Sequence, residues 1–382
     1  MVKIIKKHSN KNHGEPTTTV ADVMGTPLVS LLNIVKKQTV RYGSHTIENR
    51  ALPDFRDGLK PVFRRVIWTA NDEKMYHNGM LKKSARIVGT CIGKYHPHGD
   101  VGTYSALVTM VNMPTPLFDG RDFSNWGDPE SDAAAMRYTE CRLSEITQTY
   151  LLDPKYLACV PKVPNYDDTL EEPVYLPSKL PMLLLTGAQG IAMACTTLIP
   201  SYSFDSVKSL TKKAIKKGKC TPEMCMDLEF KFTYGGKNTN SEEELLEYYK
   251  TGEQKLTFRP NLKIGKNEIT VLDLPPNLPA SKILSTVSSV EGVKYGKNVH
   301  GRGHPEWVEI IPKRKMDSRE LRSLAHIIAN KYTIGLHAKT LVTQRHDDGT
   351  TVTFSRTTIP GIVNSWLEWR ISFERKVIEH LI

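Results

Sequence analysis

Two short helices joined by a tight turn constrain the fold of this chain more than any other local pattern. The stretch "KKSARIVGTCIGKY" predicts a first helix that ends around Gly93, and "HPHGD" predicts the turn after it. Asp100 is predicted to cap the second helix. The apolar face of that helix is predicted from helical spacing to consist of Val101, Tyr104, Val108 and Val111. This layout is that of a helix-turn-helix.

The segment around these helices is rich in positive charge. Residues 50–100 contain ten Lys and Arg against five Asp and Glu, a net +5 in a chain of 382 residues whose total is +11. Such a balance favours a polyanion as partner, either nucleic acid or an acidic membrane. The most apolar run, "PMLLLTGAQGIAMAC" at residues 181–195, is interrupted by glycines well short of the ~20 residues that a membrane span needs. Membrane binding is therefore disfavoured.

Several other classes of site are not indicated by the sequence. Residues 1–25 contain lysines but no apolar core with a cleavage site, which predicts a flexible basic tail and not a secretory signal. The six cysteines are scattered, as is typical of a reducing compartment, and "CTPEMC" lacks the second Cys/His pair of a zinc site. We expect no metal site in this chain. No G-x-x-x-x-G-K-[ST] loop is present, so ATP, if used, is expected to be bound by another chain.

The second half of the chain mixes strands and helices. Strands are predicted in "KLTFRP" and "NEITVLDLP". One helix is predicted in "SEEELLEYYKTG", which opens with Ser241, and another in "MDSRELRSLAHIIANKY", where Asp317 and Glu320 form a capping box. The last stretch predicts an amphipathic helix with the beginning of a heptad seam at Ile362, Trp366, Trp369 and Phe373.

One tyrosine beside an arginine is the candidate for chemistry. In "SDAAAMRYTECRL", Tyr138 directly follows Arg137. A tyrosine oxygen can attack a phosphodiester, become covalently attached and later be expelled, which cleaves the backbone without net hydrolysis. A guanidinium beside the attacked phosphate would stabilise both the phenolate and the charge of the transition state. The same dipeptide also fits an ordinary packed aromatic, so the surrounding sequence has to decide.

Five blocks in one order supply that context. They are "ENRALPDFRDGLKPVFRRVIW", "KKSARIVGTCIGKYHPHGD", "PLFDG", "AAAMRYTECRL" and "LPSKLPMLLLTGAQGIAMACTTLIP". Together they resemble the breakage-reunion subunit of type IIA DNA topoisomerases, the A subunit of DNA gyrase and its topoisomerase IV counterpart. The resemblance implies an α+β chain. Its expected parts are an N-terminal helix at residues 26–48, a winged-helix DNA-cleavage domain (the DNA gate) at 49–165, an α/β tower domain at 166–358 and the start of a coiled-coil arm at 359–382.

The resemblance also implies roles for individual residues. Tyr138 matches the nucleophile that takes the 5′ end of the broken strand, and Arg137 matches its transition-state partner. Ile191 matches an isoleucine that wedges between base pairs, with flanking glycines that let the backbone approach DNA. His98 is expected to contact a phosphate or the nucleophile, whereas His96 could equally be structural. The remaining DNA-binding candidates, each of which could also be a solvated surface charge, are Arg50, Lys60, Arg64, Arg65 and Lys94.

Partners and cofactors follow from the same resemblance. We expect a homodimer within an A2B2 complex, in which a B-type subunit binds ATP and its TOPRIM domain holds most of the Mg²⁺. The expected function is transient double-strand cleavage of DNA to pass a second duplex, in the cytoplasm of a bacterium or a virus-infected host, in association with the nucleoid. The alternative is a DNA-bending or scaffold protein of the same fold without cleavage activity.

Departures from the family pattern lead to two further expectations. Val101 and Ser105 stand where bacterial enzymes usually have a serine and an acidic residue, so we expect poor stabilisation of cleaved DNA by fluoroquinolones. Phe63 replaces a usual histidine, and "RDFSNWGD" replaces the usual "GQGNFG". The sequence ends at Ile382, and we expect a second polypeptide or a longer form of the chain to supply an exit gate and to cover the seam of the last helix.

Overall fold

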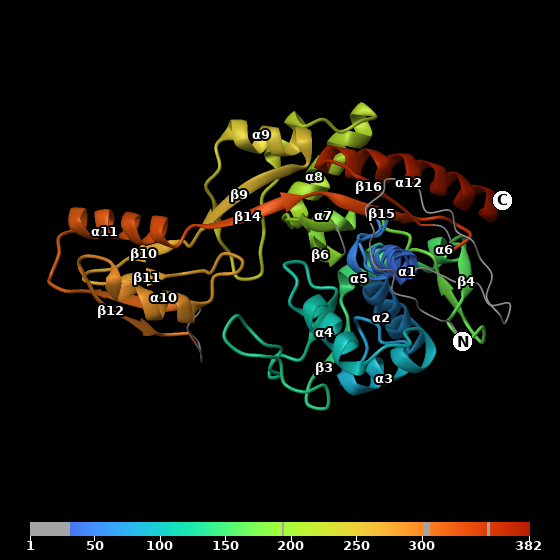
Figure 1. Cartoon of the computed structure of the whole chain (residues 1–382), viewed down its shortest axis with the longest axis horizontal. Coiled ribbons are helices and arrows are strands. Elements are labelled where there is room, and N and C mark those ends of the chain that lie inside the picture. The colour runs from blue at the N-terminus through green and yellow to red at the C-terminus, as the bar shows by residue number, and fades with distance from the viewer. Residues whose placement is uncertain (1–30, 193–194, 301–305, 350–351) are drawn as a thin grey trace, which may run out of the picture.

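The computed structural model of the chain describes residues 31–192, 195–300, 306–349 and 352–382, and it has the mixed α+β fold that the sequence predicts. The predicted basic tail at residues 1–25 lies outside these residues, as does the beginning of the predicted N-terminal helix. Within the described segments, no helix is long and apolar enough to cross a membrane. The predicted domain limits stay predictions, and the elements fall into three groups (Figure 1).

The first group is mostly helical and contains the helix-turn-helix. Its small sheet has the order β1-β3-β2, and all its pairs are antiparallel. Its buried apolar residues between Phe55 and Leu152 share one core with those of the second group. The elements are α1 (Leu31–Thr46), the π-helix η1 (Ile47–Ala51), α2 (Pro61–Asp72), β1 (Lys82–Lys83), α3 (Ser84–Lys94), α4 (Asp100–Val111), β2 (Phe118–Gly120), β3 (Glu140–Leu143), α5 (Glu145–Leu151), α6 (Pro154–Leu157), β4 (Lys162–Pro164) and β5 (Glu171–Pro173).

The second group surrounds an antiparallel sheet of order β6-β7-β14-β9-β8. The long strands β9 and β14 pair from Ile334 opposite Phe258 to Lys339 opposite Glu253 and lead outward to the third group (Figure 1). The elements are α7 (Met182–Thr186), β6 (Ala188–Ala192), β7 (Cys195–Ile199), α8 (Phe204–Lys217), the 3-10 helix η2 (Glu223–Asp227), β8 (Lys237–Asn238), α9 (Glu242–Thr251), β9 (Glu253–Arg259), β14 (Ile334–Lys339), β15 (Leu341–Arg345), β16 (Val352–Arg356) and α12 (Ile359–Leu381).

The third group has its own core, formed by residues between Ile269 and Tyr332. Its antiparallel sheet has the order β10-β11-β13-β12. The predicted capping box of α11 is confirmed at Asp317 and Glu320, and in the second group α9 begins after Ser241 as predicted. The elements are β10 (Leu262–Ile264), β11 (Ile269–Val271), α10 (Ala280–Thr286), the 3-10 helix η3 (Val287–Ser289), β12 (Val293–Asn298), β13 (Val308–Pro312) and α11 (Ser318–Lys331).

The second helix of the helix-turn-helix differs from its prediction in two details. Helix α4 begins after Gly99, and Asp100 is its first residue and not a side-chain cap. Its buried side consists of Thr103, Ala106, Leu107 and Met110, whereas Val101 is 78% exposed. Because α2 and α3 cover α4 from one direction, that side faces the core. Of the predicted apolar face, Tyr104, Val108 and Val111 are half-buried at the edge of the core and Val101 lies in solvent.

The seam of the last helix is covered by the chain itself, which corrects the expectation of an open stripe. Trp366 and Phe373 are each 2% exposed. The indole Nε1 of Trp366 donates to Ser178 Oγ at 2.8 Å, and the rings of Trp369 and Tyr175 meet edge to face at 5.4 Å. Between Trp366 and Phe373, helix α12 therefore packs against other segments of this chain. That it starts a coiled-coil arm stays a prediction.

Candidate active site

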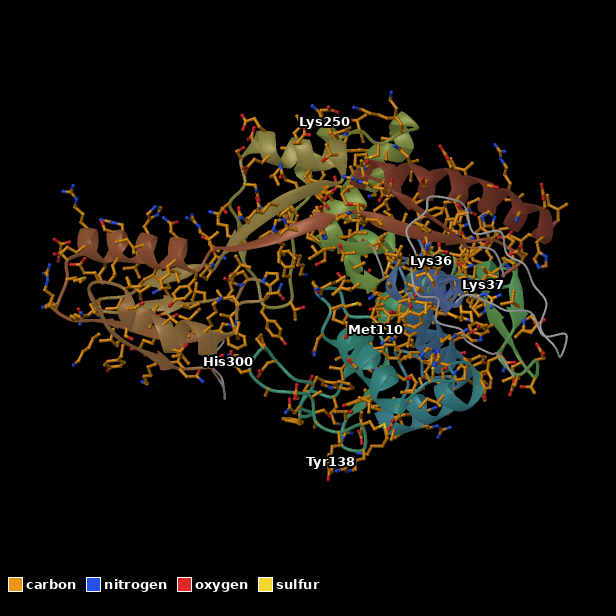
Figure 2. All side chains as sticks on the ribbon, in the orientation of Figure 1. Lys36, Lys37, Met110, Tyr138, Lys250 and His300 are labelled. Carbon is orange, nitrogen blue, oxygen red and sulfur yellow. The ribbon has the colours of Figure 1, made fainter. Side chains whose placement is uncertain are left out.

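Tyr138 lies on a turn that directly precedes strand β3. Its side chain is 63% exposed, and in Figure 2 it projects at the lower margin of the molecule, away from the body. The backbone N–H of Tyr138 donates to Ala135 O at 2.8 Å, which closes the turn. An aromatic ring exposed to this degree contributes little to a core, so the interpretation as an ordinary packed aromatic does not fit its position.

The backbone on both sides of Tyr138 is fixed to the helix-turn-helix. At the start of α3, the N–H of Ser84 donates to Thr139 O at 3.0 Å and that of Ala85 donates to Met136 O at 3.1 Å. The Thr139 hydroxyl is fully buried and donates to Ser84 Oγ at 2.8 Å. The Tyr104 hydroxyl of α4 donates to Ala134 O and lies 2.9 Å from Thr139 Oγ1. An exposed phenol on a fixed backbone is preorganised for reaction with a bound partner.

Arg137 alters the acidity of its neighbour. The guanidinium carbon of Arg137 lies 4.7 Å from the centre of the Tyr138 ring. Hydrogen bonding and charge from Arg137 hold the pKa of the Tyr138 phenol below its usual value. Arginine favours the phenolate, because the positive charge stabilises the ionised oxygen. Both Arg137 and Tyr138 are exposed, so the two side chains are accessible together from solvent.

Sequence reasoning missed a group of charges at the base of this turn. Glu140 forms ion pairs with Lys83 at 2.9 Å and with Arg121 at 3.0 Å. Its pKa is held low by the hydrogen bond from Lys83 and the charge of Arg121. Lys83 and Arg121 are each about half exposed, so they add positive charge close in the fold to Tyr138. Lys83 belongs to one of the five sequence blocks, but only the pairing of β1 with β3 shows that it lies beside Glu140.

A second cluster joins the turn after α3 to helix α2. The Arg65 guanidinium binds both carboxylate oxygens of Glu172, at 2.7 and 2.6 Å, and lies 3.3 Å from Nδ1 of His96. Burial, Arg65 and His98 together lower the pKa of His96 to about 4. His96 is therefore neutral near pH 7, and its Nδ1 accepts from Arg65. The exposed His98 ring meets that of His96 edge to face at 4.6 Å. Lys94 forms an ion pair with Asp72 at 2.6 Å.

A third cluster forms around the β6–β7 hairpin. Lys60 Nζ donates to Gln189 O at 2.5 Å, and burial and the charge of Arg50 lower the pKa of Lys60. Ile191 pairs with Thr196 near the end of the hairpin and is 76% exposed. A Cβ on Gly190 would lie 2.0 Å from Ala51 O, so this glycine lets β6 approach η1. The expectation that the flanking glycines also serve approach to DNA stays a prediction.

Arg64 differs from the other basic candidates, because it is buried. Its side chain is paired with Asp57 at 2.6 and 3.0 Å and also donates to Leu59 O. Burial disfavours its charge, but Asp57 outweighs that effect and raises the pKa of Arg64. Asp57 in turn accepts from the N–H of Leu176 at 2.9 Å. The structure thus places Arg64 in a buried ion pair that joins distant segments, away from the surface on which Arg50 is exposed.

A groove of about 870 Å³ extends from the hairpin cluster to the exposed side of α4. Arg50, Lys60 and Gln189 of the hairpin cluster line one part of it. The exposed side of α4 lines another part through Gly102 and Ser105, and the 126–133 loop that leads toward Tyr138 closes it. The groove thus runs along the exposed side of the second helix of the helix-turn-helix, between basic side chains and the turn that carries the tyrosine.

The carboxylates near Tyr138 offer no arrangement for a metal ion. Across the described ranges, no group of three or more His, Cys, Asp or Glu side chains is placed to hold one. The carboxylate closest in sequence to Tyr138 is that of Glu140, and it is already engaged by Lys83 and Arg121. The residues around the tyrosine therefore do not fit a Mg²⁺ site.

An exposed tyrosine beside an arginine, on a backbone fixed to a helix-turn-helix, defines a class of site in which a phenol is presented to solvent next to a positive charge. Comparison with known proteins identifies the family. The family model that describes the A subunit of DNA gyrase and topoisomerase IV matches residues 50–373. The chain belongs to this family.

Individual relatives show the extent of the similarity. The chain is 37% identical over 276 residues to the DNA gyrase A subunit of Metamycoplasma arthritidis, a match that covers 68% of this chain and 30% of that protein. It is 38% identical over 261 residues to the DNA topoisomerase 4 A subunit of Neisseria gonorrhoeae, with coverages of 65% and 33%. With the topoisomerase 4 A subunit of Pseudomonas aeruginosa it shares 31% identity over 371 residues, with coverages of 91% and 47%. The matches span less than half the length of each of these relatives.

Proposed function

We propose that this chain is the DNA-cleavage and religation subunit of an ATP-dependent type IIA DNA topoisomerase. The single observation that carries the proposal is the exposed Tyr138 with Arg137 beside it, on a backbone fixed to the helix-turn-helix. The family membership supports it. The complex would break both strands of one duplex, pass a second duplex through the break and reseal it.

The chemistry assigned to Tyr138 balances without hydrolysis. The phenolate oxygen forms a bond to a backbone phosphorus while the bond from that phosphorus to the 3′ oxygen breaks. The phenol proton is lost to solvent or a base, and the 3′ oxygen leaves as a hydroxyl. The new 5′-phosphotyrosyl diester keeps the bond energy, so attack by the 3′ hydroxyl restores the strand. Arg137 lowers the cost of ionising the phenol and stabilises the charge of the transition state.

The groove, which Arg50 and Lys60 line, and the separate cluster at the turn after α3 supply DNA binding. Arg50, Lys60, Arg65, Lys94 and His98 contact phosphates in this proposal, and affinity is expected to fall steeply with salt. Neutral His96 positions Arg65, and Arg64 supports the fold from inside and does not contact phosphate. Ile191 is sufficiently exposed to enter a base step as an apolar wedge.

Partners and cofactors belong to the same proposal. The chain acts as a homodimer within an A2B2 complex, because one tyrosine is needed for each strand. The B-type subunit binds ATP and holds Mg²⁺, which would assist the cleavage step, since the residues around Tyr138 do not fit that ion. The complex works in the cytoplasm, at the nucleoid.

The decisive experiment traps the covalent intermediate. The chain is incubated with duplex DNA, Mg²⁺ and its B-type subunit, and denaturant is added before the DNA ends are analysed. We expect protein on the 5′ ends with the wild type, none with Tyr138→Phe, and unchanged DNA binding in both. Tyr295→Phe is the matched control, because Tyr295 is also exposed, at 46%, and lies on the distant strand β12. An adduct with Tyr138→Phe would overturn the assignment, and DNA bending without any wild-type adduct would indicate the non-cleaving scaffold protein.

A further inference from the structure

Helix α8 presents a row of lysines that the proposed cleavage site does not use. Six lysines occur between residues 208 and 219, and this stretch contains no acidic residue. All six are exposed. We name them the α8 lysine ridge, which consists of Lys208, Lys212, Lys213, Lys216 and Lys217 on the helix and Lys219 just beyond its end.

The ridge occupies one side of the helix. The opposite side is buried through Val207, Leu210, Thr211 and Ala214, which anchor α8 to the body of the molecule. Lys208, Lys212 and Lys216 are four residues apart, so they lie in one row, and Lys213 and Lys217 form a second row beside it. The lysines are therefore gathered on a single surface and held by a packed helix.

Few local partners neutralise this charge. Lys213 pairs with Asp227 at 2.6 Å, and Lys208 lies over the Phe204 ring at 5.8 Å. Among the residues that the structure describes, the other four have no carboxylate within 4.0 Å. Like charges four residues apart destabilise an isolated helix. The helix dipole favours positive charge only in the last turn, which contains Lys216 and Lys217.

We propose that the α8 lysine ridge binds the phosphate backbone of duplex DNA, at a surface separate from the one that carries Tyr138. In Figure 1, α8 and α9 lie in the upper part of the molecule, and in Figure 2 the α9 residue Lys250 and Tyr138 lie at opposite margins. The identity of the polyanion as DNA rests on the proposed function. One chain would then hold two duplexes, one at each surface.

The dimensions of the ridge set the size of the expected effect. From Lys208 to Lys217 the helix rises about 14 Å, and duplex DNA carries one charge per about 1.7 Å of its axis. A duplex laid along the ridge could thus meet about four lysines on its near side. Each neutralised phosphate contributes about 0.9 to the slope of log affinity against log salt. Removing four lysines should lower that slope by up to about 3.6, which is about a 100-fold difference in salt sensitivity between 50 and 200 mM.

A two-duplex bridging assay tests the proposal. One short duplex carries a fluorescent donor and the other an acceptor, and the full chain is added without its partner subunit or Mg²⁺, so no cleavage chemistry is needed. We expect energy transfer with the wild type. In the ridge variant Lys208→Gln, Lys212→Gln, Lys216→Gln and Lys217→Gln, bridging should be weaker, and its fall between 50 and 200 mM salt should be about 100-fold smaller than in the wild type. Binding of a first duplex and covalent trapping should be unchanged.

Matched controls make the outcomes decisive. A variant with the same change of charge at the exposed Lys162, Lys237, Lys266 and Lys282 should bridge like the wild type. Absence of bridging by the wild type, equal loss in both variants, or normal bridging by the ridge variant would overturn the proposal. So would competition by polyglutamate or phosphatidylserine vesicles as strong as that by unlabelled duplex at equal charge. Because covalent trapping is measured separately, failure of the ridge is distinguishable from failure of Tyr138.

Discussion

The guanidinium carbon of Arg137 lies 4.7 Å from the centre of the Tyr138 ring, so the proposed nucleophile and the charge proposed to activate it are adjacent in both sequence and space. The pKa of Tyr138 is lowered by this neighbour, and its ring is exposed to solvent. Replacing Arg137 therefore tests acidity and transition-state stabilisation together.

Arg137→Gln should slow formation of the covalent adduct by about 10²–10³-fold, the usual cost of removing one donor to a developing charge. The pH at which the rate of adduct formation rises should also be higher in this variant, because the phenol loses the positive charge that favours its ionisation. Arg137→Lys keeps the charge but not the planar guanidinium, so its rate should fall between those of the wild type and Arg137→Gln. Single-turnover trapping across a pH series measures both effects. An unchanged rate and pH profile for Arg137→Gln would contradict the assignment.

Ile191→Ala should reduce DNA bending more than DNA affinity. The side chain is exposed at the hairpin and can unstack a base step, whereas phosphate contacts supply most of the binding energy. Energy transfer between labelled ends of one duplex measures the bend, and Ile191→Leu is the control that keeps an apolar wedge. A bend angle that is the same with alanine as with the wild type would count against the wedge.

Gly190→Ala should destabilise the chain by about 1–3 kcal/mol, because its Cβ would lie 2.0 Å from Ala51 O and force β6 away from η1. Gly89→Ala is the matched control. That glycine lies within α3, and a Cβ there meets nothing within 4 Å, so the change should stabilise by about 0.5–1 kcal/mol. Urea denaturation measures both. Equal effects of the two changes would show that the contact with Ala51 is unimportant.

Acid should destabilise the His96 cluster over a defined pH window. The pKa of His96 is lowered to about 4 in the folded chain, against about 6.5 when unfolded. Between these values the unfolded state binds more protons, so the free energy of unfolding falls as the pH drops from about 6.5 towards 4. Since the ring is only partly buried, we expect a loss of roughly 1–2 kcal/mol. Urea denaturation at several pH values measures the loss, and His96→Gln should reduce this part of the pH dependence. If it leaves the profile unchanged, His96 does not titrate in this way.

Local sequence determined the features whose interactions span only a few residues. The capping box of α11 is predictable because its partners are three residues apart, and helix α3 and the turn after it follow from equally local signals. The pairing of Arg137 with Tyr138 is also a contact between neighbours, and the ordered blocks around it indicated the family.

Only the tertiary structure decided which side chains are exposed and which distant groups meet. Arg64 and Arg65 are adjacent in sequence, yet Arg64 is buried against Asp57 while Arg65 binds Glu172, which is 107 residues away. The exposed side of α4 and the burial of Trp366 likewise depend on what packs against each helix. The physical reason is that burial changes the cost of a charge or the gain from an apolar group, and burial is set by non-local packing that no short pattern encodes.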